Sequence, residues 1–537
     1  MVGIFCLDFL ENFVSTTLEI ITQKNLRKSV KSAKSAFLSA FFRKFVVNKI
    51  IFTMKNLLTF LFITLFSTSS FAQNDAQRLV SAMLGETPIE EDLQELCDEI
   101  GGRVTGSLAN EQSVEWAIKK FEEAGVKVDK MAFKMPALWL EKSTTATISG
   151  GTNFTPQIVS KFYSPAKTHT GKLLDGGMGT VEDFERLGAS AKGAFVLVET
   201  DICLDIGGLF AEYTAASKTE DLAREAGVQG LVFMASRPNK LLYSFVSKKV
   251  YDNEMPQLVM AREDAKRCLR NLQENKDLQI SIKIDAETGG EYTSHNIIGE
   301  IRGSEKPDEV IIIGAHLDSW ALGTGANDNG CNVSMMIDIA RQMQRLGIKP
   351  KRTIRFALWN GEEQGYFGSW AYTQKCGKKL DKHIMAMSVD IGSGAIFGFF
   401  TNGRKELMPA LDDVLQAVQV FGEYKHVDAA IVGTDNFDFM MEGVPNLVAN
   451  HLSTNYGRTY HSASDTYDKV DLKSLKINSA IIAAVTLGFA NLPDEKITWQ
   501  RHSHEQVESL VEEQDLEFAM RMFNVWKAWD EGTRGRQ

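Results

Sequence analysis

The sequence predicts an α/β protein with a mixed, mostly parallel sheet between helices, split by an inserted β-rich domain. After Tyr292, apolar runs such as EVIIIGA and TIRFALW alternate with amphipathic segments such as CNVSMMIDIARQMQRLG. Strands that alternate with helices of this length are typical of a largely parallel sheet covered on both faces. Between about 151 and 286, short strands and Gly-rich turns predominate instead. The 537 residues also exceed one ordinary domain, so we expect at least two.

Composition is that of a globular protein and argues against two functional classes. The chain is 44% hydrophobic and 24% charged, with a formal net charge of −10. A nucleic-acid partner is not expected, because phosphate binding needs a basic face. The six cysteines are scattered without CxxC spacing, which argues against a cysteine-based metal site.

Residues 54–72 have the layout of a secretory signal peptide. A short basic start at Met54 precedes an apolar run from Leu57 to Phe66, and small residues lead to a cleavage site after Ala72. The apolar run is too short to span a membrane comfortably, so we expect no stable span in the mature, periplasmic or secreted chain. A signal peptide belongs at an N-terminus, so we expect residues 1–53 to be an upstream extension. A genuine basic N-terminal segment is the alternative.

The changes in pattern divide the chain into six segments. They are the extension (1–53), the signal peptide (54–72), an N-terminal part of the main domain (73–150), the β-rich insertion (151–286), the α/β part that carries the charged motifs (287–495) and a polar, helical tail (496–537). The tail carries one apolar stripe, formed by Phe518, Met522, Phe523 and Trp526.

Charged residues gather where the predicted strands end, which is where open α/β sheets bind ligands. They are His316 after EVIIIGA, Glu362 and Glu363 after TIRFALW, Asp390 at the end of HIMAMSVD, His461 after NLVAN, and Asp328 in a Gly-rich loop. Two imidazoles with several carboxylates and no thiolate suit zinc or a similar divalent ion. Five donors are too many for one tetrahedral catalytic zinc, but they fit two metals if one carboxylate bridges them.

The segments IIIGAHLDSW, GANDNG, FALWNGEEQGYFGS, SVDIGSG and YHSASDTYD closely resemble the M28 family of di-zinc exopeptidases. Within that family they resemble the carboxypeptidase Q (plasma glutamate carboxypeptidase) branch, and the insertion resembles a protease-associated domain. The resemblance covers roughly Ala76 to Leu492. It implies an aminopeptidase-like fold and hydrolysis of terminal peptide bonds in dipeptides or short peptides. A dimer is usual in that branch, which leaves a homodimer open.

The resemblance also implies a role for each matching residue. His316 and Asp390 would bind one Zn²⁺, Glu363 and His461 a second, and Asp328 would bridge the two. Glu362 would act as general base toward the water that bridges the metals. Asp318 would orient the imidazole of His316, and Tyr460 would hydrogen-bond the tetrahedral oxyanion. The metal ligands do not determine which end of the peptide is cleaved. We expect a substrate with a free amine.

Two other functions remain as alternatives. A non-catalytic receptor-like module could use the same fold, but such modules lose ligands or the base, whereas all six groups are present here. An acyl transferase like glutaminyl cyclase also shares the fold, but it works with one zinc. The complete two-metal set and the inserted domain favour the peptidase.

Overall fold

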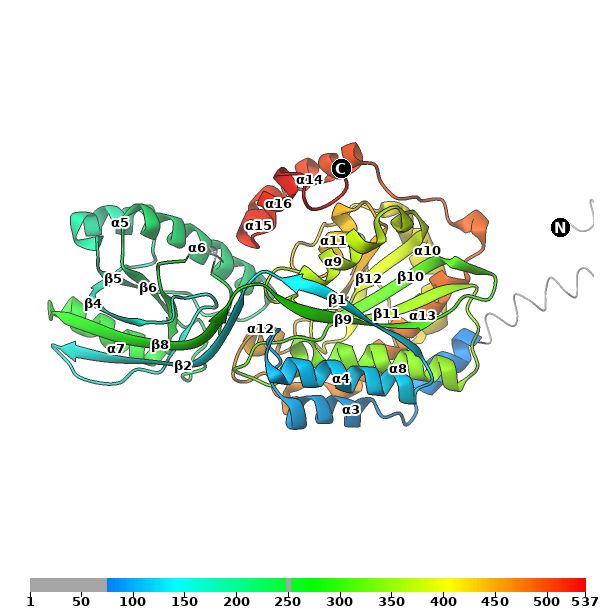
Figure 1. Cartoon of the computed structure of the whole chain (residues 1–537), viewed down its shortest axis with the longest axis horizontal. Helices are drawn as coiled ribbons and strands as arrows, with labels where there is room; N and C mark the ends of the chain where they lie inside the picture. Colours follow the sequence, from blue (N-terminus) through cyan, green and yellow to red (C-terminus); the bar gives the residue numbers. More distant parts are fainter. Residues whose placement is uncertain (1–74, 248–252) are drawn as a thin grey trace, which may run out of the picture. The chain divides into compact units, whose positions relative to one another are not determined.

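A seven-stranded mixed sheet forms the framework of the main domain (Figure 1). The computed structural model describes residues 75–247 and 253–537, so the predicted signal peptide and upstream extension lie outside the described residues. The strand order is β1 (Lys127–Met135), β9 (Tyr292–Ile301), β11 (Arg352–Trp359), β10 (Lys306–His316), β12 (His383–Ser388), β14 (Asn446–His451) and β13 (Ile396–Phe400). The four strands β11, β10, β12 and β14 run parallel to one another, while the outer strands pair antiparallel. This confirms the predicted mixed α/β class.

Helices cover both faces of this sheet because alternate residues of its central strands are apolar on each side. One face carries α3 (Ile89–Glu95), α4 (Leu108–Glu123), α8 (Cys331–Arg345), α10 (Met408–Leu415) and α13 (Leu472–Asn491), and the other carries α9 (Phe367–Cys376) and α11 (Asn436–Met441). Along β10, Ile311 and Ile313 belong to the larger core with α8 and α13. Val310 and Ile312 point the other way, into the core that contains Tyr372 of α9.

The helix α13 is long and apolar enough to cross a membrane by length and composition, and no other helix in the described ranges is. Its side chains Ile482, Val485 and Phe489 are instead fully buried in the core beneath the sheet. The helix therefore packs as an element of the interior.

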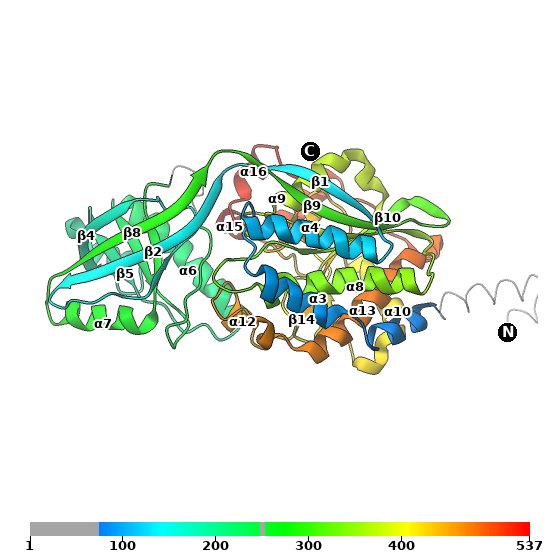
Figure 2. The ribbon, with the colours of Figure 1, turned by 60° about the horizontal axis from the view of Figure 1, so that its bottom comes forward.

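A second seven-stranded sheet lies in the sequence between β1 and β9. Its order is β2 (Leu138–Gly150), β8 (Leu278–Gly289), β4 (Thr168–Asp175), β5 (Phe195–Val198), β6 (Gly230–Met234), β7 (Gln257–Met260) and β3 (Ile158–Ser160). The long strands β2 and β8 pair antiparallel along their whole length (Figure 2). The sheet therefore begins at Leu138, so the expected insertion of 151–286 leaves β2 outside. Apolar and polar residues alternate in β2 as they do in β1. Because such a local pattern does not show which sheet a strand joins, the sequence did not assign β2 to the second sheet.

Three helices accompany the second sheet: α5 (Val181–Leu187), α6 (Ile206–Glu225) and α7 (Arg262–Gln273). The sequence pattern indicates only one of them, the C-terminal part of α6. Residues of α6 and of the connection after β6 matter for the site described below.

The C-terminal tail forms α14 (His504–Glu513), α15 (Glu517–Met522) and α16 (Trp526–Asp530). Its buried side chains Val507, Met520 and Trp529 pack with Phe437 and Met441 of α11. A buried ion pair between Arg534 and Asp438 of α11 adds to this contact, with Nε–Oδ1 and Nη2–Oδ2 distances of 2.8 Å. The tail is therefore part of the main domain.

Candidate metal centre

The structure brings together all five residues predicted to bind metal. His316 is the last residue of β10, Asp328 precedes α8, Glu363 follows β11, Asp390 follows β12, and His461 follows α12 (Tyr456–Thr459) in the loop after β14. All five side chains are buried. Because the central strands are parallel, their carboxyl ends meet at one edge of the sheet, and this edge gathers the five side chains.

Asp328 lies between the two imidazoles. Its Oδ1 is 3.1 Å from Nε2 of His316, and its Oδ2 is 3.3 Å from Nε2 of His461. Each imidazole has a second carboxylate beside the same nitrogen: Asp390 Oδ1 lies 3.0 Å from His316, and Glu363 Oε2 lies 3.0 Å from His461. The arrangement is thus two similar halves that share one carboxylate.

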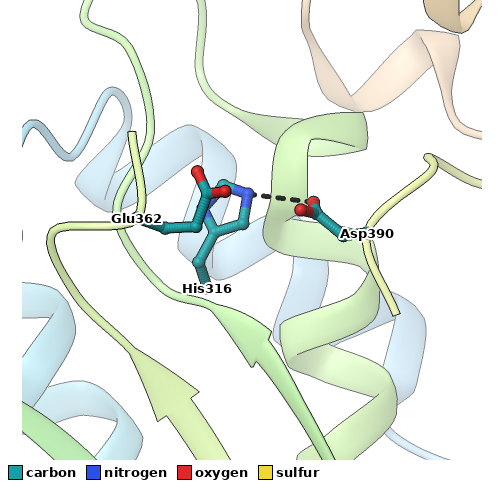
Figure 3. Close-up of side chains that lie close together, drawn as sticks. All are labelled: His316, Glu362 and Asp390. Carbon is teal, nitrogen blue, oxygen red and sulfur yellow. Dashed lines mark hydrogen bonds and ion pairs between the residues drawn. The ribbon is translucent and has the colours of Figure 1, made fainter. Parts of the chain in front are cut away.

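Glu362 lies beside the half that contains His316 and Asp390 (Figure 3). Its carboxylate stands next to the imidazole ring and faces the same space as the Asp390 carboxylate. The neighbouring residue, Glu363, turns to His461 instead, and Nε1 of Trp320 donates to its Oε2 at 2.5 Å. The two adjacent glutamates therefore face different halves of the cluster.

The peptide backbone holds the imidazole of His316. Nδ1 of His316 lies 2.9 Å from the carbonyl oxygen of Asp318, while the Asp318 carboxylate is 3.7 Å away. That carboxylate accepts the hydroxyl of Thr105 at 2.9 Å and the N–H groups of Glu362 and Glu363 at 3.4 Å. Asp318 is thus placed to orient His316 through its backbone and the two glutamates through its side chain, which differs from the expected contact.

Residues of α6 and of the connection after β6 hold the imidazole of His461. Its Nδ1 lies 3.1 Å from the carbonyl oxygen of Ser244, and the hydroxyl of Tyr213 lies 3.4 Å from the same nitrogen. The N–H of Ser244 donates back to the carbonyl of His461 at 3.2 Å, and the N–H of Ala463 donates to the carbonyl of Leu242 at 3.1 Å. Because Nδ1 is engaged by these two partners, Nε2 is the ring nitrogen that faces the cluster.

Tyr460 stacks on the imidazole of His461, with ring centroids 3.6 Å apart. Its hydroxyl lies 3.3 Å from that of Tyr213 on α6. Burial raises the pKa of Tyr460 well above its ordinary value, so this phenol remains a hydrogen-bond donor.

Asp465 is a buried carboxylate that the sequence reasoning missed. It accepts the backbone N–H groups of Asn327 at 2.7 Å and of Asp328 at 3.1 Å. These bonds fix the loop from which Asp328 reaches the cluster. Its place in the segment YHSASDTYD, four residues after His461, is the signal that could have found it.

Burial and mutual repulsion of the carboxylates dominate the electrostatics of the cluster. Burial lowers the pKa of both histidines, but nearby carboxylates outweigh it: Asp390 and Glu362 raise that of His316 well above its usual value, and Glu363 and Asp328 raise that of His461 to about 9. Burial raises the pKa of Glu363 to about 7 and that of Glu362 well above its ordinary value. A buried space with this many acidic oxygens favours positive charge.

The donor set fits a divalent cation. Imidazole nitrogens and carboxylate oxygens without thiolate are ligands that zinc accepts. Among the described residues, Oε1 of Glu363 is buried without a hydrogen-bonding partner. A cation would neutralise the carboxylates and engage such an oxygen, so the residues present fit a metal centre.

A cavity opens over the cluster. Its floor includes Asp328, Glu362, Glu363, Asp390 and His461. Its walls come from α6 and neighbouring parts of the second sheet, from the loop after Glu363, and from the residues that follow α15 in the tail. A small substrate entering this cavity would meet the acidic cluster at its base.

Known proteins share both the sequence and the fold. Residues 296–486 match the model of peptidase family M28. Carboxypeptidase Q of Xenopus laevis is 30% identical over 247 residues, which cover 45% of this chain and 52% of that protein, so the chain spans about half the length of this curated relative.

Solved structures extend the similarity over most of the chain. A peptidase M28 precursor from Shewanella amazonensis SB2B is 26% identical with a TM-score of 0.72, covering 79% of this chain and 97% of that one. A zinc aminopeptidase from Bacillus subtilis shares the fold, with 19% identity and a TM-score of 0.59 over 74% of this chain and 93% of its own. Residues 296–486 therefore form a peptidase family M28 domain, and the Shewanella amazonensis structure extends the similarity over most of the chain.

Proposed function

We propose that the chain is a di-zinc exopeptidase that hydrolyses terminal peptide bonds of dipeptides or short peptides. The observation that carries this proposal is the position of Asp328, with one carboxylate oxygen facing each imidazole. In the proposed site, His316 and Asp390 hold one ion, Glu363 and His461 hold the other, and Asp328 contributes to both. The Bacillus subtilis relative is a zinc enzyme, which supports zinc as the metal.

The bound ions would supply Lewis acidity, which lowers the pKa of water and polarises a scissile carbonyl. Glu362 would then take a proton from the attacking water and transfer it to the leaving amine. Burial raises the pKa of this carboxyl, which suits a group that must hold and then release a proton. Tyr460 lines the same cavity, and its hydroxyl would donate a hydrogen bond to the developing oxyanion.

Metal content and turnover, measured together on one panel, test this proposal. Purified wild type and Glu362→Gln would be compared for bound zinc and for cleavage of free and N-blocked dipeptides. We expect about two zinc ions per chain in both proteins, and cleavage of unblocked dipeptides by wild type alone. Loss of general-base catalysis reduces turnover by roughly 10²–10⁴-fold. A wild type that binds no zinc would disprove the ligand assignment and favour the receptor-like alternative.

The glutaminyl cyclase alternative predicts a different product. The same protein would form pyroglutamate from an N-terminal glutamine and would need one zinc. The shared position of Asp328 favours two ions, and mass spectrometry of the product distinguishes ring closure from hydrolysis.

We further propose that the chain is exported and that the second sheet is a protease-associated insertion that shapes the substrate cavity. The signal-peptide layout of residues 54–72 supports export. N-terminal sequencing of the mature protein should start at Gln73. A mature chain that still carries residues before Met54 would disprove both the cleavage site and the assigned start.

A further inference from the structure

The tail brings an apolar wall to the substrate cavity. Met522, Phe523 and Asn524, at and just after the end of α15, line the same cavity as Glu362 and His461. More than 130 residues separate this segment from Glu362 in the sequence. The cavity is therefore completed by a part of the chain that carries none of the proposed metal ligands.

Phe523 connects two other walls of the cavity. Its ring centroid lies 5.9 Å from that of Tyr213 on α6 and 6.3 Å from that of Tyr366, which follows the glutamate pair. Both distances are typical of aromatic side chains in contact. Phe523 is only partly buried, so part of a large apolar ring remains available to a ligand in the cavity.

Arg534 holds this wall in a fixed place. Besides its ion pair with Asp438, its Nη1 donates to the carbonyl of Gly365 at 3.2 Å. Gly365 belongs to the turn that begins at Glu362, whose carbonyl accepts the N–H of Gly365 at 2.9 Å. One buried guanidinium therefore ties the tail to the segment that bears the proposed general base.

Away from the acidic floor, aromatic side chains supply much of the lining of the cavity. Of the described lining residues there, Lys161 and Glu220 are the charged ones, and both are engaged elsewhere. Nζ of Lys161 donates to Gln257 at 2.8 Å and lies 4.3 Å from the ring centroid of Phe245, and Glu220 pairs with Arg224 at 2.5 Å. The walls thus offer apolar surface to a substrate side chain.

We propose that Phe523 and Met522 form an apolar subsite that receives a large apolar side chain next to the scissile bond. This deepens the proposed function and rests on it: the preferred substrates would be short peptides with an aromatic or large aliphatic residue. The tail would then determine side-chain preference, while the metal cluster determines the reaction.

The test combines Phe523→Ala and Phe523→Leu with two series of unblocked dipeptides. One series varies the N-terminal residue from Ala to Phe, and the other varies the C-terminal residue in the same way. Phe518→Ala is the matched control, because Phe518 lies on α15 five residues before Phe523, is 41% exposed and does not line the cavity. Each substitution is also made in the Glu362→Gln background, so that dipeptide binding is measured by calorimetry without turnover.

We expect Phe523→Ala to weaken binding of the Phe-containing dipeptides of one series by about ten-fold, in line with the loss of one apolar contact surface. Binding of the Ala-containing dipeptides should change little, Phe523→Leu should restore most of the affinity, and zinc content should stay near wild type. Equal losses for Ala and Phe dipeptides, or no loss in either series, would overturn the subsite. Binding that depends on Phe523 without any hydrolysis by wild type would sustain the subsite and disprove the proposed function.

Discussion

Single residues in this site act mainly by fixing other residues. Asp465 touches no imidazole, yet it accepts the N–H groups of Asn327 and Asp328 and so sets the loop that carries the shared carboxylate. Partners of this kind orient metal ligands, and their loss typically weakens metal binding 10–100-fold.

We therefore predict that Asp465→Asn lowers zinc affinity by roughly 10–100-fold, because the amide accepts these hydrogen bonds less strongly than a carboxylate. Competition with a chromophoric chelator measures the affinity. Asp468→Asn is the control, since Asp468 is exposed and pairs with Lys469 at the surface. Equal affinities in Asp465→Asn and wild type would show that Asp465 has no positioning role.

His451, at the end of β14, is one group through which acid changes the free energy of unfolding. Its Nδ1 lies 2.8 Å from the carbonyl of Gly394, and burial lowers its pKa to about 4. In the unfolded chain the value returns to about 6.5, so the unfolded state binds more protons as pH falls between these values. The stability contributed by neutral His451 is therefore full above pH 6.5 and is lost progressively toward pH 4.

We predict that, between pH 6.5 and 4.5, the urea midpoint of the chelator-treated wild type responds less favourably to acid than that of His451→Gln, by a slope of up to one proton. The glutamine can still donate to Gly394 but does not titrate. Urea unfolding followed by fluorescence across this pH range measures the slope. An unchanged slope in the variant would show that His451 contributes nothing to the acid response.

At the scale of residues, the sequence predicted the site residues that directly follow strands. It missed the site residues that other parts of the chain contribute. His316, Asp390 and the glutamate pair end or follow apolar runs, and parallel strands bring such ends together. Tyr213 lies on α6 and Ser244 in the connection after β6, and both contact His461 only through tertiary structure. No spacing in the sequence relates them to the site. The metal-binding roles themselves stay predictions.

At the scale of elements, the same limit explains which strands and helices could be predicted. Buried strands such as β10 and β11 stand out as apolar runs between turns. β2 alternates as β1 does, so its membership of the second sheet depends on pairing with β8, which lies more than 120 residues later. The tail is polar with one apolar stripe, and that pattern predicts helices but not the surface they cover.

A buried ion pair anchors the tail beside its apolar contacts. The side chains of Arg534 and Asp438 are 4% and 1% exposed, so removing the cation leaves a buried carboxylate without its partner. We predict that Arg534→Met destabilises the protein by about 3–5 kcal/mol and exposes residues 504–537 to limited proteolysis.

Thermal unfolding and proteolysis followed by mass spectrometry measure the two effects of Arg534→Met. Arg521→Met provides the comparison, because its pair with Glu517 is about half exposed and should contribute at most about 0.5 kcal/mol. A stable, protease-resistant Arg534→Met protein would contradict the assigned role of the pair.

At the scale of the whole molecule, the connection after β6 contacts the loop of His461 through residues 242–244, beside the candidate metal centre. A ligand that binds only the folded form stabilises it by about 2.7 kcal/mol at one hundred times its dissociation constant. We therefore predict that a chelator lowers the melting temperature and that added zinc restores it, as measured by calorimetry. A melting temperature that changes with neither the chelator nor added zinc would show that no ion binds to the folded cluster.

The pairing of Ser244 with His461 has a consequence for how the chain could be controlled. If His461 holds an ion as proposed, any movement that withdraws residues 242–244 also disturbs that ligand. Ion occupancy and docking of the second sheet then form one linked equilibrium, in which each favours the other by the same factor. Scarcity of zinc would then loosen the docking of the two parts, and a force that separates them would release zinc.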